Sequence, residues 1–93
     1  MPVRRSKLDI MLDVLSAVQN GEEKPTRIMY SANLSWKPTR KILGILVDQG
    51  LLRDIEVTGS KRSKRSYVIT EKGVNVLRYF DGVRDLIEAL TLY

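Results

Sequence analysis

The amino-acid sequence predicts one small α+β domain that is mainly helical, and three observations support this prediction. First, 93 residues leave room for a single domain with a modest core. Second, apolar residues recur every three or four positions in stretches that open at Ser6, Ser35 and Glu71, as on one face of a helix. Third, two short apolar stretches enclose a basic, serine-containing segment, which is typical of two strands joined by a hairpin.

The first helix is expected to begin after Ser6, because Ser6 and Asp9 have the spacing of a capping box with Asp in place of Glu. Gly21 is suited to end it. One apolar stripe on this helix consists of Leu8, Met11, Leu12, Leu15 and Val18. A second stripe beside it consists of Ile10, Val14 and Ala17. Such a wide apolar face predicts a contact beyond the domain's own core, for example with another subunit.

A short helix and a tight turn are expected next. Pro25 is suited to the first turn of a helix, because its missing N–H needs no partner there. The following residues 27–32 are too few to form a stable helix alone, so packing must hold them. Residues 33–35 are then expected to form a tight turn that directs Leu34 into the core.

The third helix is expected to end near Gln49 and has two possible starts. Ser35 is a good capping residue, but Pro38 disfavours helical geometry at the residue before it, which would move the start to Lys37. At about 100° per residue, this helix has an inward face and an outward face. The inward face consists of Thr39, Ile42, Leu43, Leu46 and Val47. The outward face consists of Lys37, Lys41, Gly44 and Asp48, flanked by Arg40.

Two strands and a basic loop are expected after the third helix. The strands are placed at residues 51–58 and 67–69, where apolar and polar residues partly alternate. The loop between them, residues 59–66, has no acidic residue and contains the four cations Lys61, Arg62, Lys64 and Arg65. These four charges repel one another unless an anion is present. Phosphate contact is therefore the favoured interpretation, with a disordered polar loop as the alternative.

Thr70 is expected to cap a last helix whose apolar residues are spaced for contact with another helix. One seam, with coiled-coil spacing, consists of Val76, Phe80, Val83, Ile87 and Leu90. An overlapping seam consists of Tyr79, Val83, Leu86, Leu90 and Tyr93. Gly82 predicts a kink or a break between the two halves of this helix. The seam predicts a homodimer interface in residues 74–93, and the alternative is a helix that folds back onto residues 1–73.

The composition excludes most catalytic and metal-binding classes. The chain has no cysteine and no histidine, which excludes a disulfide scaffold, a thiolate nucleophile, an iron–sulfur cluster and a cysteine zinc site, and removes the usual general base. It also has no glycine-rich phosphate loop, so neither an enzyme nor a cofactor is expected. The longest apolar stretch, residues 42–47, is far shorter than the roughly 18 residues of a membrane span, so a cytoplasmic protein is expected.

The charge of the chain is unevenly distributed. Sixteen Lys and Arg against 11 Asp and Glu give a net charge of +5. Residues 1–73 contain 14 basic and 8 acidic side chains, whereas residues 74–93 contain 2 basic and 3 acidic ones. This division indicates one part that faces a polyanion and another that self-associates. A basic surface that serves only solubility is the alternative.

The predicted order is helix, helix, tight turn, helix, two-stranded hairpin, helix, which is the winged helix-turn-helix arrangement. In this arrangement the third helix enters the major groove of DNA and the hairpin contacts the backbone. The expected DNA contacts on the third helix are Ser35, Trp36, Lys37, Thr39, Arg40 and Lys41. Ser35 is equally suited to a plain cap, and the helical phase of Trp36 favours packing. We expect a sequence-specific homodimeric regulator, with an architectural DNA-binding protein, a protein-interaction module or RNA binding as alternatives.

Three motifs strengthen this expectation: residues 24–36 (KPTRIMYSANLSW), residues 50–52 (GLL) and residues 67–73 (YVITEKG). They resemble small archaeal winged-helix DNA-binding proteins, which occur in archaeal cells and in viruses that infect them, and the resemblance covers residues 6–77. It implies a homodimer held by the carboxy-terminal helix, bound to double-stranded DNA as a regulator or chromatin protein of the nucleoid, or of the host cytoplasm for a viral member. Pro38 and Gly82 depart from the family's pattern.

Overall fold

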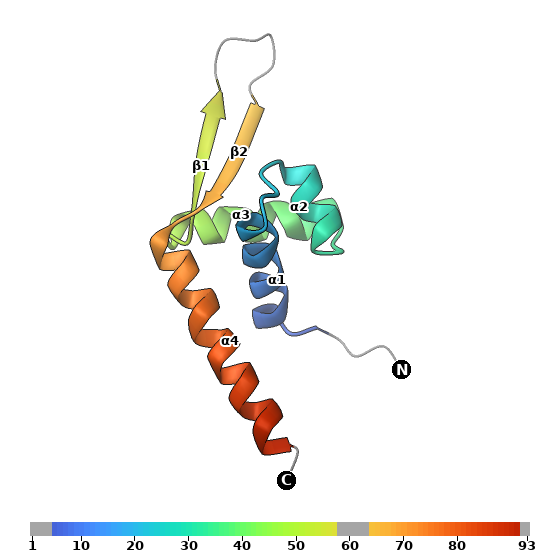
Figure 1. Ribbon diagram of the computed structural model, residues 1–93. Helices are drawn as coiled ribbons and strands as arrows, with labels where there is room; N and C mark the ends of the chain where they lie inside the picture. Colours follow the sequence, from blue (N-terminus) through green and yellow to red (C-terminus); the bar gives the residue numbers. More distant parts are fainter. Residues whose placement is uncertain (1–4, 58–63, 92–93) are drawn as a thin grey trace.

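The computed structural model describes residues 5–57 and 64–91, which form four helices and a two-stranded sheet. In chain order the elements are α1 (Lys7–Gln19), α2 (Pro25–Ser31), α3 (Trp36–Asp48), β1 (Leu52–Val57), β2 (Lys64–Ile69) and α4 (Glu71–Thr91). Helices α1, α2 and α3 gather into one body, and the β1–β2 hairpin and α4 leave it in opposite directions (Figure 1). The mainly helical α+β fold predicted from the sequence is therefore confirmed.

The first three helices end in the same way. The residue after each helix's final cap has a positive φ, namely Gly21 at 103°, Asn33 at 54° and Gly50 at 77°. In the second case the N–H of Leu34 donates to the carbonyl of Met29 at 3.0 Å, and the helix is closed by this Schellman pattern. The predicted turn at 33–35 forms because asparagine tolerates the left-handed conformation, and Leu34 packs against the core.

Helix α1 is the centre of the hydrophobic core. Five of its side chains are buried, and they pack with Ile28, Leu43, Leu46 and Leu52 from the elements around them. Val14 and Ala17, which were assigned to a second apolar stripe, are 0% and 3% exposed. The expectation that this stripe contacts another subunit is therefore wrong for both residues, because the chain's own core covers them.

The two strands pair antiparallel, with Leu52 opposite Ile69 and Val57 opposite Lys64. Strand β2 begins three residues earlier than predicted, because the backbone of residues 64–66, which had been assigned to the loop, continues the pairing with β1. The N–H of Tyr67 donates to the carbonyl of Glu23 at 2.9 Å. The connection between α1 and α2 therefore lies beside β2 and anchors the hairpin to the helical body.

Thr70 caps α4 as predicted and also ties it to the end of α3. Its Oγ1 accepts a hydrogen bond from the N–H of Gly73 at 3.1 Å and donates to the carbonyls of Gly50 and Leu51. Next to it, the Lys72 ammonium donates to the carbonyl of Gln49 at 2.8 Å. The motif at residues 70–73 thus joins the start of α4 to the last turn of α3.

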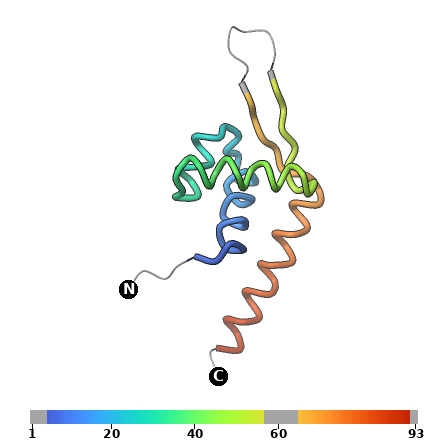
Figure 2. Tube along the Cα trace, turned by 180° about the vertical axis from the view of Figure 1, so that it is seen from behind, coloured from blue at the N-terminus to red at the C-terminus, as the bar shows by residue number. Residues whose placement is uncertain are grey.

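Helix α4 is continuous through Gly82, so the predicted kink or break is wrong. The alternative of a helix that folds back onto the domain is confirmed for the first half of the seam, and the homodimer interface stays a prediction for the second half. Val76 and Phe80 pack against the domain's own core. The prediction that the whole seam contacts a second subunit is therefore wrong for these two residues. Ile87 and Leu90 remain 57% and 64% exposed, and Figure 2 shows the last turns of α4 standing away from the helical body.

Candidate nucleic-acid interface

Helix α3 begins at Trp36, directly after the turn, with Ser35 as its N-cap residue. This confirms the earlier of the two predicted starts and places Pro38 at the third helical position, where a missing N–H costs little. That position is also where a capping serine finds its donor, and proline has none. Ser35 is therefore the N-cap residue as predicted, although its side chain makes no capping hydrogen bond.

The outward face of α3 agrees with the predicted one for its cations: Lys37, Arg40 and Lys41 are all exposed. Thr39 does not belong to this face. It is 0% exposed, and its Oγ1 donates to the carbonyl of Ser35 at 2.9 Å. Its inclusion among the DNA contacts is corrected for this reason, because its side chain is buried and points inward from the first turn of α3.

Trp36 lies at the surface where α3 begins. It is 46% exposed, so it is not a core residue, and the choice between a helix–helix contact and a groove contact stays open. On the preceding helix, Tyr30 is 76% exposed, and sequence analysis had named it only as part of a motif. Two large aromatic side chains, Tyr30 and Trp36, are therefore exposed on the α2–α3 unit, where a partner could contact them.

The helix-turn-helix segment, residues 24–48, has one acidic residue, Asp48 at the end of α3, and five cations: Lys24, Arg27, Lys37, Arg40 and Lys41. Nε of Arg27 lies 3.9 Å from Oε2 of Glu22. Both side chains are exposed, and such an ion pair contributes little to stability. In the part of the chain that the structure describes, the other ion pair joins Arg5 and Asp13 at 2.9 Å. The cations of α3 thus have no carboxylate partner among the described residues.

The hairpin supplies a second set of predicted contacts. Lys61 and Arg62 lie outside the described residues, and for Lys64 only the backbone, at the start of β2, is described. Arg65 is exposed on β2, opposite Glu56 of β1. Opposite charges on facing positions favour this strand register.

The hairpin and α3 meet at one end of the helical body. Strand β1 starts four residues after α3 ends, and the hairpin rises from that end of α3 (Figure 1). Seen from the opposite side, α3 crosses in front of α1 (Figure 2). The predicted DNA contacts therefore lie on the body and the hairpin, while α4 points the other way.

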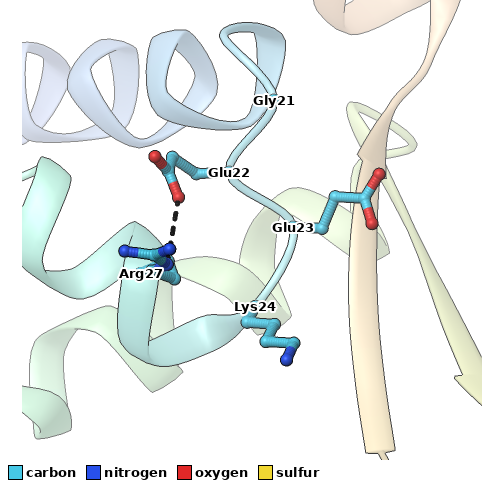
Figure 3. A pocket seen from close by; sticks show the side chains of 5 residues that line it. All are labelled: Gly21, Glu22, Glu23, Lys24 and Arg27. Carbon is cyan, nitrogen blue, oxygen red and sulfur yellow. Dashed lines mark ion pairs between the residues drawn. The ribbon is translucent and has the colours of Figure 1, made fainter.

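A surface hollow of about 340 Å³ lies where α1 leads into α2 (Figure 3). Its lining combines Glu22 and Glu23 with Lys24 and Arg27, and the Glu23 side chain is turned toward β2. Among residues 5–57 and 64–91, no three acidic side chains are grouped as a metal site would need. Over the same residues, no helix is long and apolar enough to cross a membrane.

The family model of the winged helix-turn-helix matches residues 4–88, nearly the whole chain. The chain belongs to the winged helix-turn-helix family. An uncharacterised protein of Methanocaldococcus jannaschii is 38% identical to this winged-helix chain over 85 residues, which are 91% of the chain and 36% of that protein. The chain thus spans about a third of this curated relative. Archaeal relatives agree with the resemblance inferred from the sequence motifs.

Two solved structures show how widely this winged-helix arrangement is shared. Sso10a-2, a DNA-binding protein from Sulfolobus solfataricus, is 26% identical, with a TM-score of 0.74 over 94% of this chain and 86% of its own. A MarR family transcriptional regulator from Silicibacter pomeroyi is 25% identical, with a TM-score of 0.72 over 89% of this chain and 56% of its own. The fold is therefore of the transcription-regulator type, and membership of this family confirms that the chain is not an enzyme.

Arg5 is a structural residue of this winged-helix domain that sequence analysis missed. Its guanidinium donates to the carbonyl of Ala32 at 2.7 Å and to that of Asn33 at 2.8 Å, and it also pairs with Asp13. These carbonyls lie at the end of α2 and in the turn before α3. No local pattern pointed to this contact, because the partners are 27 and 28 residues away in sequence.

Proposed function

We propose that this chain binds double-stranded DNA as a homodimeric, sequence-specific transcription regulator. In this proposal α3 enters the major groove and the β1–β2 hairpin contacts the phosphate backbone. The observation that carries the proposal is the outward face of α3, where Lys37, Arg40 and Lys41 are exposed and the only acidic residue of the helix, Asp48, lies at its carboxy-terminal end. A major groove about 12 Å wide accepts one such helix.

The side chains of α3 suit different tasks in this groove. Arg40 has the two-pronged guanidinium that recognises guanine, whereas Lys37 and Lys41 provide point charges for bases or phosphates. The Ser35 hydroxyl, which makes no capping bond, is at the amino-terminal end of α3, where helices favour phosphate. Trp36 adds an exposed ring beside it. Thr39 has no part in this contact, because it is buried.

The proposed role of the hairpin is electrostatic. Arg65 is exposed on β2, and the sequence places Lys61, Arg62 and Lys64 close to it. Phosphates attract such cations whatever the base sequence, so the hairpin strengthens binding and fixes the orientation of the domain. Sequence discrimination is assigned to α3 instead.

The homodimer is proposed through the second half of the α4 seam, where Val83 is half-buried and Ile87 and Leu90 are exposed. Two copies of a reading domain related by a twofold axis would contact two half-sites, and helix-turn-helix dimers commonly space these by about one turn of DNA. The Ile87 and Leu90 side chains are more than half exposed, and covering them with a second subunit would stabilise the dimer by removing apolar surface from water. The likeness to Sso10a-2, itself described as a DNA-binding protein, supports the DNA-binding part of the proposal.

The test begins with selection of duplexes from a random pool by the purified chain. Affinity is then measured by fluorescence anisotropy for an enriched duplex and for a scrambled duplex of the same composition. We expect a preference of roughly a thousandfold or more for the enriched duplex. Arg40→Ala should cost about 1–3 kcal/mol on the enriched duplex and little on the scrambled one.

Arg78→Ala is the matched control, since it removes an exposed cation from α4 and should alter neither affinity. Equal affinity for both duplexes would contradict sequence-specific binding and favour an architectural DNA-binding protein instead. Absence of DNA binding would overturn the proposal altogether. Sedimentation of Ile87→Asp tests the dimer separately, because a charge in the seam should leave monomers.

A further inference from the structure

Two apolar surfaces in the described part of the chain have no cover from the chain itself. One is a groove between the first half of α1 and α3, with a volume of about 480 Å³. The other is the end of α4, residues 85–91, which we call the α4 tail. Each surface has features that fit the other, although within one chain they do not meet.

The groove is apolar inside and basic at its edge. Ile10 and Met11 from α1 face Ile42 and Ile45 from α3, and Ile45 is 48% exposed. The remaining lining residues include the cations Lys7 and Lys41. Neither lysine forms an ion pair with a described residue. An occupant of this groove should therefore combine aliphatic side chains with negative charge.

The α4 tail has this combination. Leu86, Ile87 and Leu90 are 60%, 57% and 64% exposed, so they reach neither the groove nor the core of their own chain. The tail also contains Asp85 and Glu88 and no cation. It is helical throughout, so its shape is already fixed before any partner binds.

We propose that the groove between α1 and α3 of one chain receives the α4 tail of a second copy. This inference rests on the homodimer of the proposed function and specifies where its contact lies. Aliphatic side chains of the tail cover Ile10 and Ile45, and its carboxylates lie near Lys7 and Lys41. Because the contact is reciprocal in a twofold dimer, two tails fill two grooves and the interface closes on itself.

This placement connects dimerisation to DNA recognition. The groove is partly built from α3, and Lys41 lies both at its edge and on the outward face of that helix. A tail in the groove packs against the rear of the recognition helix and positions Lys41. Formation of the dimer thus adds a contact to a recognition helix whose flanking residues are already held within one chain.

Charge complementation tests the proposal without DNA. A tail-reversed chain has Asp85→Lys and Glu88→Lys, and a groove-reversed chain has Lys7→Glu and Lys41→Glu. In sedimentation velocity, each variant alone should dimerise roughly tenfold or more weakly than the unchanged protein, because like charges meet in both contacts. An equimolar mixture should recover dimers, since both contacts then join opposite charges. Unimpaired homodimers, or a mixture that fails to recover, would overturn the proposal.

Cross-linking then locates the contact, which the absence of native cysteine makes direct. Chains with Ile45→Cys are mixed with chains of different mass that have Leu90→Cys, and mild oxidation should link one of each. Arg53→Cys, on the exposed side of β1, replaces Ile45→Cys as the control and should remain unlinked.

The outcomes also separate this inference from the proposed function. Dimers that link only Leu90→Cys to Leu90→Cys overturn the groove contact and leave the homodimer intact. Monomers in sedimentation overturn both. DNA binding is measured in neither experiment, so its failure is a different result from theirs.

Discussion

Two glycines of α4 provide a matched pair for testing how this helix is joined to the domain. A Cβ added at Gly73 would collide with the backbone carbonyl of Leu51 and would lie 2.7 Å from Cγ1 of Ile69. At Gly82 the same atom would meet nothing within 4 Å. Both glycines lie in the same helix, Gly82 in its interior and Gly73 in its first turn, so replacing either by alanine gains at most about 1 kcal/mol in helix propensity.

The difference in the free energy of unfolding between the two variants therefore reports mainly the cost of the close approach at Gly73. Overpacking typically costs about 1–3 kcal/mol, and a backbone carbonyl that must move places Gly73→Ala near the upper value. After subtraction of the propensity gain, we expect a net destabilisation of about 2 kcal/mol. Gly82→Ala should instead stabilise the protein by about 1 kcal/mol.

Thermal denaturation followed by circular dichroism at one fixed protein concentration is the appropriate assay, because association would make the midpoint depend on concentration. For a domain of this size, each kcal/mol shifts Tm by about 4–8 °C. The expected results are a fall of about 8–16 °C for Gly73→Ala and a rise of about 4–8 °C for Gly82→Ala. Equal shifts in the same direction would refute the argument that Gly73 is required by packing.

Two further predictions concern the contacts of the amino-terminal residues. Arg5→Ala should lower the free energy of unfolding by about 1–3 kcal/mol, because the carbonyls of Ala32 and Asn33 lose a charged donor, and urea denaturation measures this loss. Arg5→Lys should recover only part of it, since one ammonium cannot reproduce the fork. Hydrogen bonds from Ser6 hold the pKa of Asp9 below its ordinary value of 3.8, so its stabilising effect is complete above pH 3.8 and disappears as the pH falls through the lower pKa of the folded protein. In Asp9→Asn, denaturation across that acidic range should lack this component, and an unchanged pH profile would contradict the assignment.

Sequence patterns predicted the elements of this fold well wherever the determining contacts are local. The capping box of α1 depends on residues three apart, and the ends of α1 and α3 depend on a single glycine each. The start of α3 at Trp36 follows from Ser35 and Pro38, which are also close in sequence. Such signals act within one turn of a helix and can therefore be read along the chain.

Long-range packing accounts for what the sequence did not reveal. Helical periodicity identified the α4 seam, but it could not divide the seam between Val76, which packs on the core, and Leu90, which is exposed. Which seam residues are buried depends on how much of α4 lies beside the other helices of the domain, and this is a long-range contact. The kink predicted at Gly82 is absent because an exposed glycine lowers helix stability by only about 1 kcal/mol, which a helix anchored at its start tolerates.

The side chains on the outward face of α3 make none of the hydrogen bonds that hold the helix in place. Arg5 binds the carbonyls of Ala32 and Asn33 before α3, and Thr70 and Lys72 bind the carbonyls of the residues that directly follow it. Both ends of the recognition unit are therefore fixed by residues outside α3. Lys37 and Arg40 support none of these contacts, so their identities are free of folding requirements. The exposed residues of α3 can therefore be exchanged at little cost in stability, which suits the DNA contact proposed for this face.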